Sequence, residues 1–187
     1  MKILSQVVAT NAVIIKQMGF VLKFDEKTRG AYLFQAIWID TLLNQIIACH
    51  FCSTDYKKQG MLTGLILNEL TFSSKIRYFL RILESYPEIA SKHPNIKKKL
   101  ENVREFRNKV AHSKLDTSGE FLSKKTNYIR LIYFKNGKRA HYNITEQLNK
   151  EKTSEIVKLH YALNEILVDL TGGELGKLIP IGRLDLE

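Results

Sequence analysis

The feature that most constrains the fold of this chain is a helical spacing of apolar residues that one arginine interrupts. From residue 96 onward, apolar residues recur every three or four positions, at Ile96, Leu100, Val103, Phe106, Val110 and Ala111. This spacing predicts an amphipathic helix over residues 95–112. With about 100° of rotation per residue, the apolar stripe spans roughly 140° and Arg107 falls inside it.

Arg107 has no acidic neighbour on the predicted helix. The positions three and four residues away hold Val103, Arg104, Val110 and Ala111. Placing a guanidinium among apolar groups without a partner costs free energy. We therefore expect either an acid from a neighbouring helix or an anionic ligand at a cleft. Asp40, the one acid in the apolar segment 31–51, is a candidate partner of Arg107, and the alternative is that Asp40 faces solvent.

The helix ends in the string Arg107-Asn108-Lys109-Val110-Ala111-His112. This string resembles the Arg-x4-His signature of the HEPN family (higher eukaryotes and prokaryotes nucleotide-binding domains), which commonly reads Arg-Asn-x3-His at a helix end. Segments 70–76 and 103–113 also resemble the mannitol repressor family, a non-catalytic relative. The resemblance covers roughly residues 31–113 and 145–170. It implies an all-α, HEPN-like bundle of four or five helices.

The HEPN resemblance also implies an activity: metal-independent cleavage of RNA by a toxin or defence effector. Its site would form where the motif helices of a homodimer meet, so that two arginines and two histidines line one cleft. Arg107 would bind phosphate through its planar fork of donors. His112 would transfer protons, because an imidazole has a reference pKa near 6.5. Asn108 would orient the imidazole or the phosphate.

Three other interpretations of the motif remain open. Arg107 and Asn108 can join helices through buried hydrogen bonds, and His112 can cap the helix C-terminus, where a cation interacts well with the dipole. The chain can be a non-catalytic regulator similar to the mannitol repressor, acting through protein contacts. It can also be an RNA-binding module without turnover.

The charge of the chain favours a polyanionic partner. Lys and Arg number 29 against 19 Asp and Glu, which gives a net charge of +10. An excess of this size is typical of nucleic-acid binding, although solubility alone explains surface lysine. The runs at residues 57–58, 97–99 and 124–125 either contact phosphate or are solvated. We expect RNA, a second copy of the chain, and an antitoxin or regulatory protein as partners.

The two cysteines, Cys49 and Cys52, cannot build a disulfide framework. Their spacing is that of half a zinc site or a redox pair, but no second pair of ligands accompanies it, so two reduced cysteines are the favoured interpretation. We expect no cofactor and no metal. The apolar segment 1–22 is interrupted by polar residues, which predicts neither a signal peptide nor a membrane span. A single cytoplasmic domain over residues 1–187 is expected.

The remaining patterns predict four further helices and a hairpin. The helices are expected at residues 4–22, where a strand is the alternative, and at 31–51, 61–86 and 145–170, the last capped by Thr145 and ended by Gly172 and Gly173. Segments 24–30, 53–60, 87–94 and 113–127 are expected as connectors. Asn136-Gly137, between two β-rich runs, predicts a hairpin inserted at about residues 128–144. Arg139, His141 and Asn143 share one face of it, either contacting RNA or solvated.

Overall fold

The computed structural model describes residues 2–53, 55–135 and 137–172, with the backbone alone for residues 2–10. It is mostly helical and contains one small antiparallel sheet. The chain divides into two compact units, each built from two segments. One unit comprises Met1–Ala36 and Glu105–Glu155, and the other Ile37–Arg104 and Ile156–Glu187. We call the first the motif unit, because it contains residues 107–112, and the second the helical unit.

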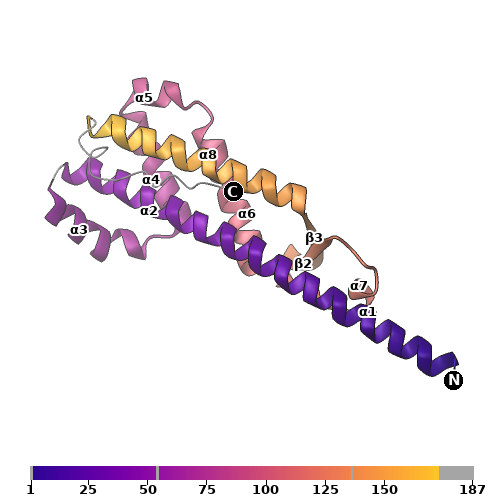
Figure 1. Cartoon of the computed structure of the whole chain (residues 1–187). Helices are drawn as coiled ribbons and strands as arrows, with labels where there is room; N and C mark the ends of the chain where they lie inside the picture. Colours follow the sequence, from indigo (N-terminus) through magenta and orange to yellow (C-terminus); the bar gives the residue numbers. More distant parts are fainter. Residues whose placement is uncertain (1, 54, 136, 173–187) are drawn as a thin grey trace. The chain divides into compact units, whose positions relative to one another are not determined.

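The chain begins with continuous helical backbone (Figure 1). Helix α1 spans Lys2–Asp25, a π-helical turn spans Glu26–Gly30, and α2 spans Ala31–Cys52. The first helix is therefore confirmed over a strand, and the connector predicted at 24–30 is wrong. A salt bridge of 2.5 Å between Arg29 and Asp25 spans this turn, with the spacing that stabilises helical backbone. One glycine at position 30 is not enough to end the helix.

The sheet of the motif unit has three antiparallel strands in the order β1-β2-β3. They span Lys114–Leu115, Tyr128–Lys135 and Lys138–Thr145. The predicted hairpin is confirmed, and Gly137 at its turn has a φ of +73°, which favours glycine. Asn136 lies outside the described residues.

The connector predicted at 113–127 is wrong in part, because it contains β1 and the short helix α7 (Gly119–Leu122). The Asp116 amide donates to the Arg130 carbonyl at 2.8 Å, and the Ser118 hydroxyl caps α7 by accepting from the Phe121 amide. Helix α7 and strand β2 both contact α1, and the Gln17 amide donates to the Thr126 carbonyl at 2.8 Å. These contacts fix the end of the segment at residues 113–127.

The helical unit breaks the predicted helix at 61–86 into three pieces. They are α3 (Tyr56–Leu65), a 3₁₀ turn (Leu67–Glu69) and α4 (Phe72–Glu84). Thr71 ends the continuity because its hydroxyl accepts from the Ser74 amide, which makes Thr71 the N-cap of a new helix. Asp55 caps α3 in the same way, so most of the connector predicted at 53–60 is helical. The connector predicted at 87–94 contains α5 (Pro87–Lys92), with a proline in its first turn.

Two long helices, α6 (Ile96–His112) and α8 (Glu146–Leu170), confirm their apolar patterns. Thr145 caps α8 by accepting from the Leu148 amide at 3.1 Å, as predicted, and Gly173 lies outside the described residues. In the helical unit, α2, the 3₁₀ turn and α4 meet in a core of Ile47, Ala48, Leu67 and Ile82. Within the described ranges, none of the helices combines the length and hydropathy that crossing a membrane requires.

Candidate functional site

The motif lies at the C-terminal end of α6, where the buried side of the helix has rotated. Ile96, Leu100, Val103, Phe106 and Val110 are all buried, as predicted, but Ala111 is exposed. From Ile96 to Val110 the buried positions recur every 3.5 residues on average, so the buried stripe drifts by about 20° per seven residues relative to a 3.6-residue helix. The placement of Ala111 in the stripe is therefore wrong, and Arg107 lies at its edge.

Arg107 is half-buried rather than sealed in the core, and its guanidinium makes an exposed hydrogen bond. Its Nη1 donates to the Oδ1 of Asn108 at 3.2 Å. In the described part of the motif unit, no carboxylate comes within 4.0 Å of this guanidinium. Arg107 therefore retains donors that could bind an oxyanion, since a guanidinium has five N–H groups in a planar fork.

Asp40, the acid that the sequence offered to Arg107, pairs with another cation. Its Oδ2 lies 2.6 Å from the Nζ of Lys75. The Lys75 side chain is 4% exposed and that of Asp40 is 34% exposed. The ion pair belongs to the helical unit, and it explains how a buried lysine is accommodated there.

His112, the last residue of α6, is exposed. At the C-terminal end of this helix, Nη1 of Arg29 donates to the carbonyl oxygen of Val110 at 3.2 Å and to that of Ser113, the residue after the helix, at 3.0 Å. Asp25 holds the same guanidinium from the other side. Arg29 thus performs the capping that the sequence offered to His112, and the imidazole is accessible to solvent.

Aromatic side chains anchor the opposite side of α6. The rings of Tyr32 and Phe106 pack edge to face, with centroids 4.6 Å apart, and Tyr142 packs against Phe106 at 6.1 Å. The ammonium of Lys109 lies 4.7 Å from the centre of the Tyr142 ring. Burial raises the pKa of Tyr32 far above its usual range, and negative charge at Glu155 adds to the shift. The motif residues are therefore carried on a helix whose inner side is fixed.

The three predicted site residues are only partly brought together. Arg107 and Asn108 are joined by a hydrogen bond, whereas Asn108 and His112 lie one turn apart on the exposed side of α6. Within the described residues, no hydrogen bond links Asn108 to His112. Asn108 thus orients the guanidinium and leaves the imidazole unassisted.

The sequence interpretation missed Arg29, which positions the end of the motif helix. The charge of segment 24–30 and its final glycine predict a connector instead. The available signal was the four-residue spacing of Asp25 and Arg29, which is typical of an ion pair along a helix.

Cys49 and Cys52 lie at the end of α2 as free thiols. Burial raises the pKa of the Cys49 thiol, and the neighbouring Cys52 adds to the shift. His50 lies between them and makes a 3.2 Å hydrogen bond to the Tyr86 hydroxyl. Over the part of the chain that the structure describes, no three His, Cys, Asp or Glu residues gather in a way that could hold a metal ion.

The site therefore consists of a half-buried arginine that an amide orients, an exposed histidine one turn further on, and a second arginine that holds the helix end. The chain matches no protein-family model, no curated protein and no solved structure.

Proposed function

We propose that this protein is a metal-independent endoribonuclease of HEPN type that acts as a homodimer, in the role of a toxin or defence effector. The observation that carries the proposal is that one helix end presents both the guanidinium of Arg107, which retains available donors, and the exposed imidazole of His112. The resemblance of this string to the HEPN signature and the net charge of +10 support an RNA substrate.

The proposed reaction is an internal transfer at one phosphodiester. The ribose 2′ oxygen loses its proton and bonds to the adjacent phosphorus, while the bond from phosphorus to the 5′ oxygen breaks and that oxygen gains a proton. The products are a 2′,3′-cyclic phosphate and a 5′ hydroxyl. His112 moves the protons, and Arg107 stabilises the charge that develops on the phosphate oxygens. Asn108 keeps the guanidinium oriented.

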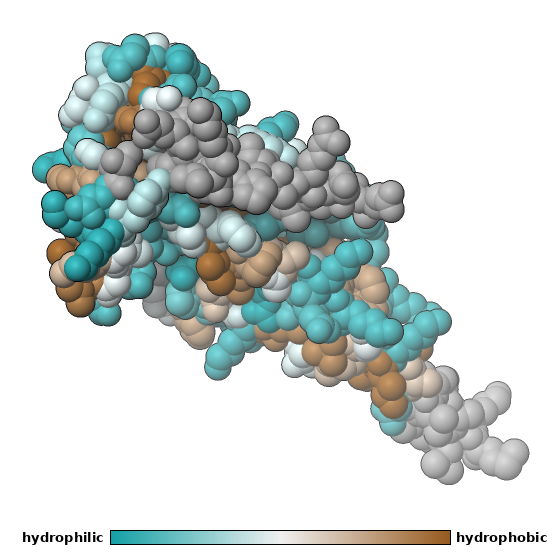
Figure 2. Space-filling view, turned by 60° about the vertical axis from the view of Figure 1, so that its left-hand side comes forward, coloured by the Kyte–Doolittle hydropathy of each residue, from teal (hydrophilic) through white to brown (hydrophobic). Residues whose placement is uncertain are grey.

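A homodimer would supply the second arginine and histidine that one chain lacks. Helix α1 of the motif unit exposes Ile15 and Leu22, which are seven residues apart and therefore on one side of the helix. They are 72% and 52% exposed, respectively. Figure 2 shows apolar surface at the lower right of the molecule. Exposed apolar surface of this kind is typical of protein contact sites and supports the proposed assembly.

The decisive experiment incubates purified protein with a fluorophore-quencher RNA in the presence of EDTA. We expect cleavage that leaves 2′,3′-cyclic phosphate ends, and no cleavage of DNA of the same sequence. His112→Ala should reduce the rate by at least about 100-fold, the lower range for losing a general acid or base. Glu105→Ala, an exposed change on the same helix, is the matched control and should retain activity.

Arg107→Lys separates charge from geometry, because lysine keeps the charge but lacks the fork. We expect it to be nearly as impaired as Arg107→Ala. RNA binding without cleavage would instead support a binding module, and neither activity would support a regulator. Retained cleavage in His112→Ala contradicts the proposed enzyme.

The proposed dimer has its own test. Sedimentation of the wild-type protein should give the mass of two chains, and Ile15→Lys should give one chain with little cleavage activity. Lys16→Ala, the neighbouring exposed position on α1, is the matched control and should remain dimeric. A wild-type monomer with full activity would contradict the composite site.

A further inference from the structure

One face of the β2–β3 hairpin carries exposed aromatic, basic and polar side chains. Residues directly opposite in an antiparallel pair point to the same side of the sheet. Phe134 lies opposite Arg139, Ile132 lies opposite His141, and Lys114 of β1 lies opposite Ile132. We call this the outer face, and above the Tyr128–Thr145 pair it comprises Lys114, Arg130, Ile132, Phe134, Arg139, His141 and Asn143. All of these side chains are exposed except Arg130 and Ile132, which are half-buried.

The outer face combines an accessible aromatic ring with positive charge. Phe134 is 74% exposed, although its type is normally placed in a core. Its cross-strand neighbour is Arg139. The hairpin segment 128–145 contains four cations, Arg130, Lys135, Lys138 and Arg139, and no acidic residue. Any negatively charged partner therefore meets no repulsion from the hairpin itself.

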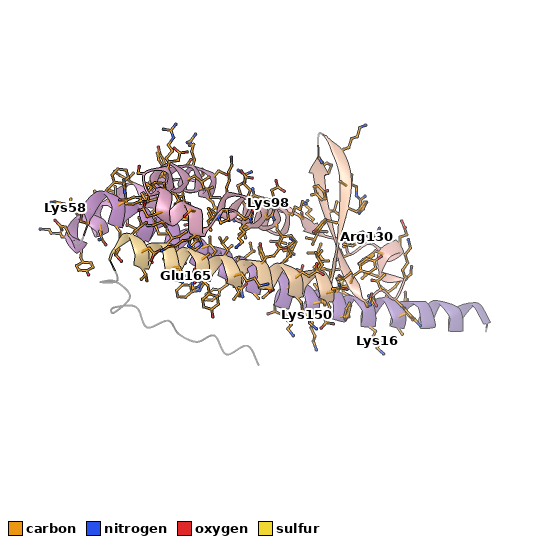
Figure 3. The ribbon with its side chains drawn as sticks, turned by 90° about the horizontal axis from the view of Figure 1, so that it is seen from above. Lys16, Lys58, Lys98, Arg130, Lys150 and Glu165 are labelled. Carbon is orange, nitrogen blue, oxygen red and sulfur yellow. The ribbon has the colours of Figure 1, made fainter. Side chains whose placement is uncertain are left out.

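The base of the hairpin is occupied by its own contacts. Arg130 pairs with Asp116 at 3.2 Å, and its guanidinium lies 4.5 Å from the centre of the Phe121 ring on α7. Figure 3 shows Arg130 near the base, away from the tip. Near this end of the face, Asp116 is buried and paired with Arg130, and the exposed Glu120 is paired with Lys124. The available charge and the exposed ring therefore lie in the half of the hairpin towards the tip.

An exposed ring beside cations suits an unpaired nucleic-acid strand. Bases of a single strand can stack on an aromatic side chain, while arginine and lysine neutralise the phosphates between them. A duplex keeps its bases stacked inside and offers mainly backbone. An acidic peptide would pair with the cations of this face, but it has no flat base to stack on the ring of Phe134.

We propose that the outer face binds a single-stranded nucleic acid, with one base stacked on Phe134 and phosphates held by Arg139 and Lys114. Lys114 follows His112 by two residues, which span at most about 7 Å of extended chain. A strand on this face would therefore lead towards the end of the motif helix. The delivery of that strand for cleavage rests on the proposed function, whereas the binding itself does not.

Fluorescence anisotropy with a labelled 2′-O-methyl uridine 12-mer tests the binding, because that strand has no free 2′ hydroxyl and cannot be cleaved by the proposed reaction. Phe134→Thr keeps a residue typical of strands and should raise Kd roughly 5- to 150-fold, the range for one lost base stack. Leu65→Ala, which removes a comparably exposed apolar side chain from α3, is the matched control and should leave Kd unchanged.

The salt dependence tests the charged contacts. Arg139→Gln should weaken binding and reduce the slope of log K against log salt by about 0.7, the value for one phosphate contact to a single strand. Lys150→Gln, an exposed change on α8, should preserve the slope. A duplex of equal length should bind more weakly than the single strand.

Equal affinity of Phe134→Thr and the wild-type protein, equal affinity for duplex and single strand, or equally tight binding of polyglutamate would each overturn the proposal. Circular dichroism confirms that each variant is folded. If the protein binds this strand through Phe134 but leaves RNA intact, only the nuclease proposal is contradicted. If the protein cleaves RNA but Phe134→Thr binds the strand as well as the wild-type protein does, only the outer-face proposal is contradicted.

Discussion

The guanidinium of Arg29 donates a 3.0 Å hydrogen bond to the carbonyl oxygen of Ser113, the residue that follows His112. A residue from the turn between α1 and α2 thus closes the end of the motif helix. The last carbonyls of a helix have no partner within the helix, and a charged donor satisfies them strongly. The position of His112 depends on this contact, although Arg29 is distant from it in sequence.

Arg29→Ala should lower the free energy of unfolding by about 1–3 kcal/mol, because the carbonyls of Val110 and Ser113 lose a charged donor. Urea unfolding monitored by circular dichroism measures this loss. In the proposed nuclease, cleavage should fall as well, since the helix end that carries His112 loosens. Lys27→Ala, in the same turn, is the control, and a similar loss in that variant would contradict a specific role for Arg29.

The stability of the fold should depend on pH through the carboxyl group of Asp116. Burial opposes its ionisation, but hydrogen bonds from Ser118 and the positive charges of Arg130 and Arg139 outweigh burial and lower its pKa. A carboxyl whose pKa is lowered in the folded state stabilises the fold at pH values above its unfolded-state pKa of about 3.9. This stabilisation is lost as the pH falls through the folded-state pKa.

Asp116→Asn should therefore cost about 1–3 kcal/mol at neutral pH, and the difference from the wild-type protein should shrink below about pH 4. Thermal unfolding across a pH series measures both effects. Asp169→Asn removes a more exposed partner, that of Lys92, and should cost less than about 1 kcal/mol. A pH-independent difference for Asp116→Asn would show that ionisation is not involved.

Replacing Asp40 should cost more folding stability than replacing its partner Lys75. Asp40→Ala leaves a buried ammonium without a counter-charge and should cost up to about 3–5 kcal/mol. Lys75→Met replaces the buried charge with an apolar chain, while the partly exposed Asp40 can be hydrated, so little stability should be lost. Chemical denaturation of both variants measures the asymmetry, and equal losses would contradict it.

Phe106 should be the largest single contributor to anchoring α6 in the motif unit. It is 3% exposed and contacts Tyr32 and Tyr142. Phe106→Ala should cost about 3–5 kcal/mol through lost burial and the cavity it leaves. Phe134→Ala removes the same side chain from an exposed position and should change stability little. Differential scanning calorimetry of the two variants compares them, and similar melting temperatures would show that Phe106 is not an anchor.

Local patterns were sufficient to predict several elements correctly. The apolar spacing of α6 and α8, the Thr145 cap and the hairpin around Gly137 were all present in the sequence. Such elements follow from periodicity and turn chemistry between residues near one another in the chain. The same reasoning failed where a side-chain cap begins a new helix, as at Thr71, and where helical backbone continues through a charged turn, as at Arg29.

The sequence by itself determined that a cation would lie along the apolar side of α6, with a histidine one turn beyond it. Only the tertiary structure decided what surrounds them. It paired Asp40 with Lys75, placed Arg29 against the end of α6, and joined Asn108 to Arg107 by a hydrogen bond. Periodicity specifies which side of a helix is buried, but the partner of a charge is chosen by the packing of segments that are far apart in the chain, where an unpaired buried charge is too costly to keep.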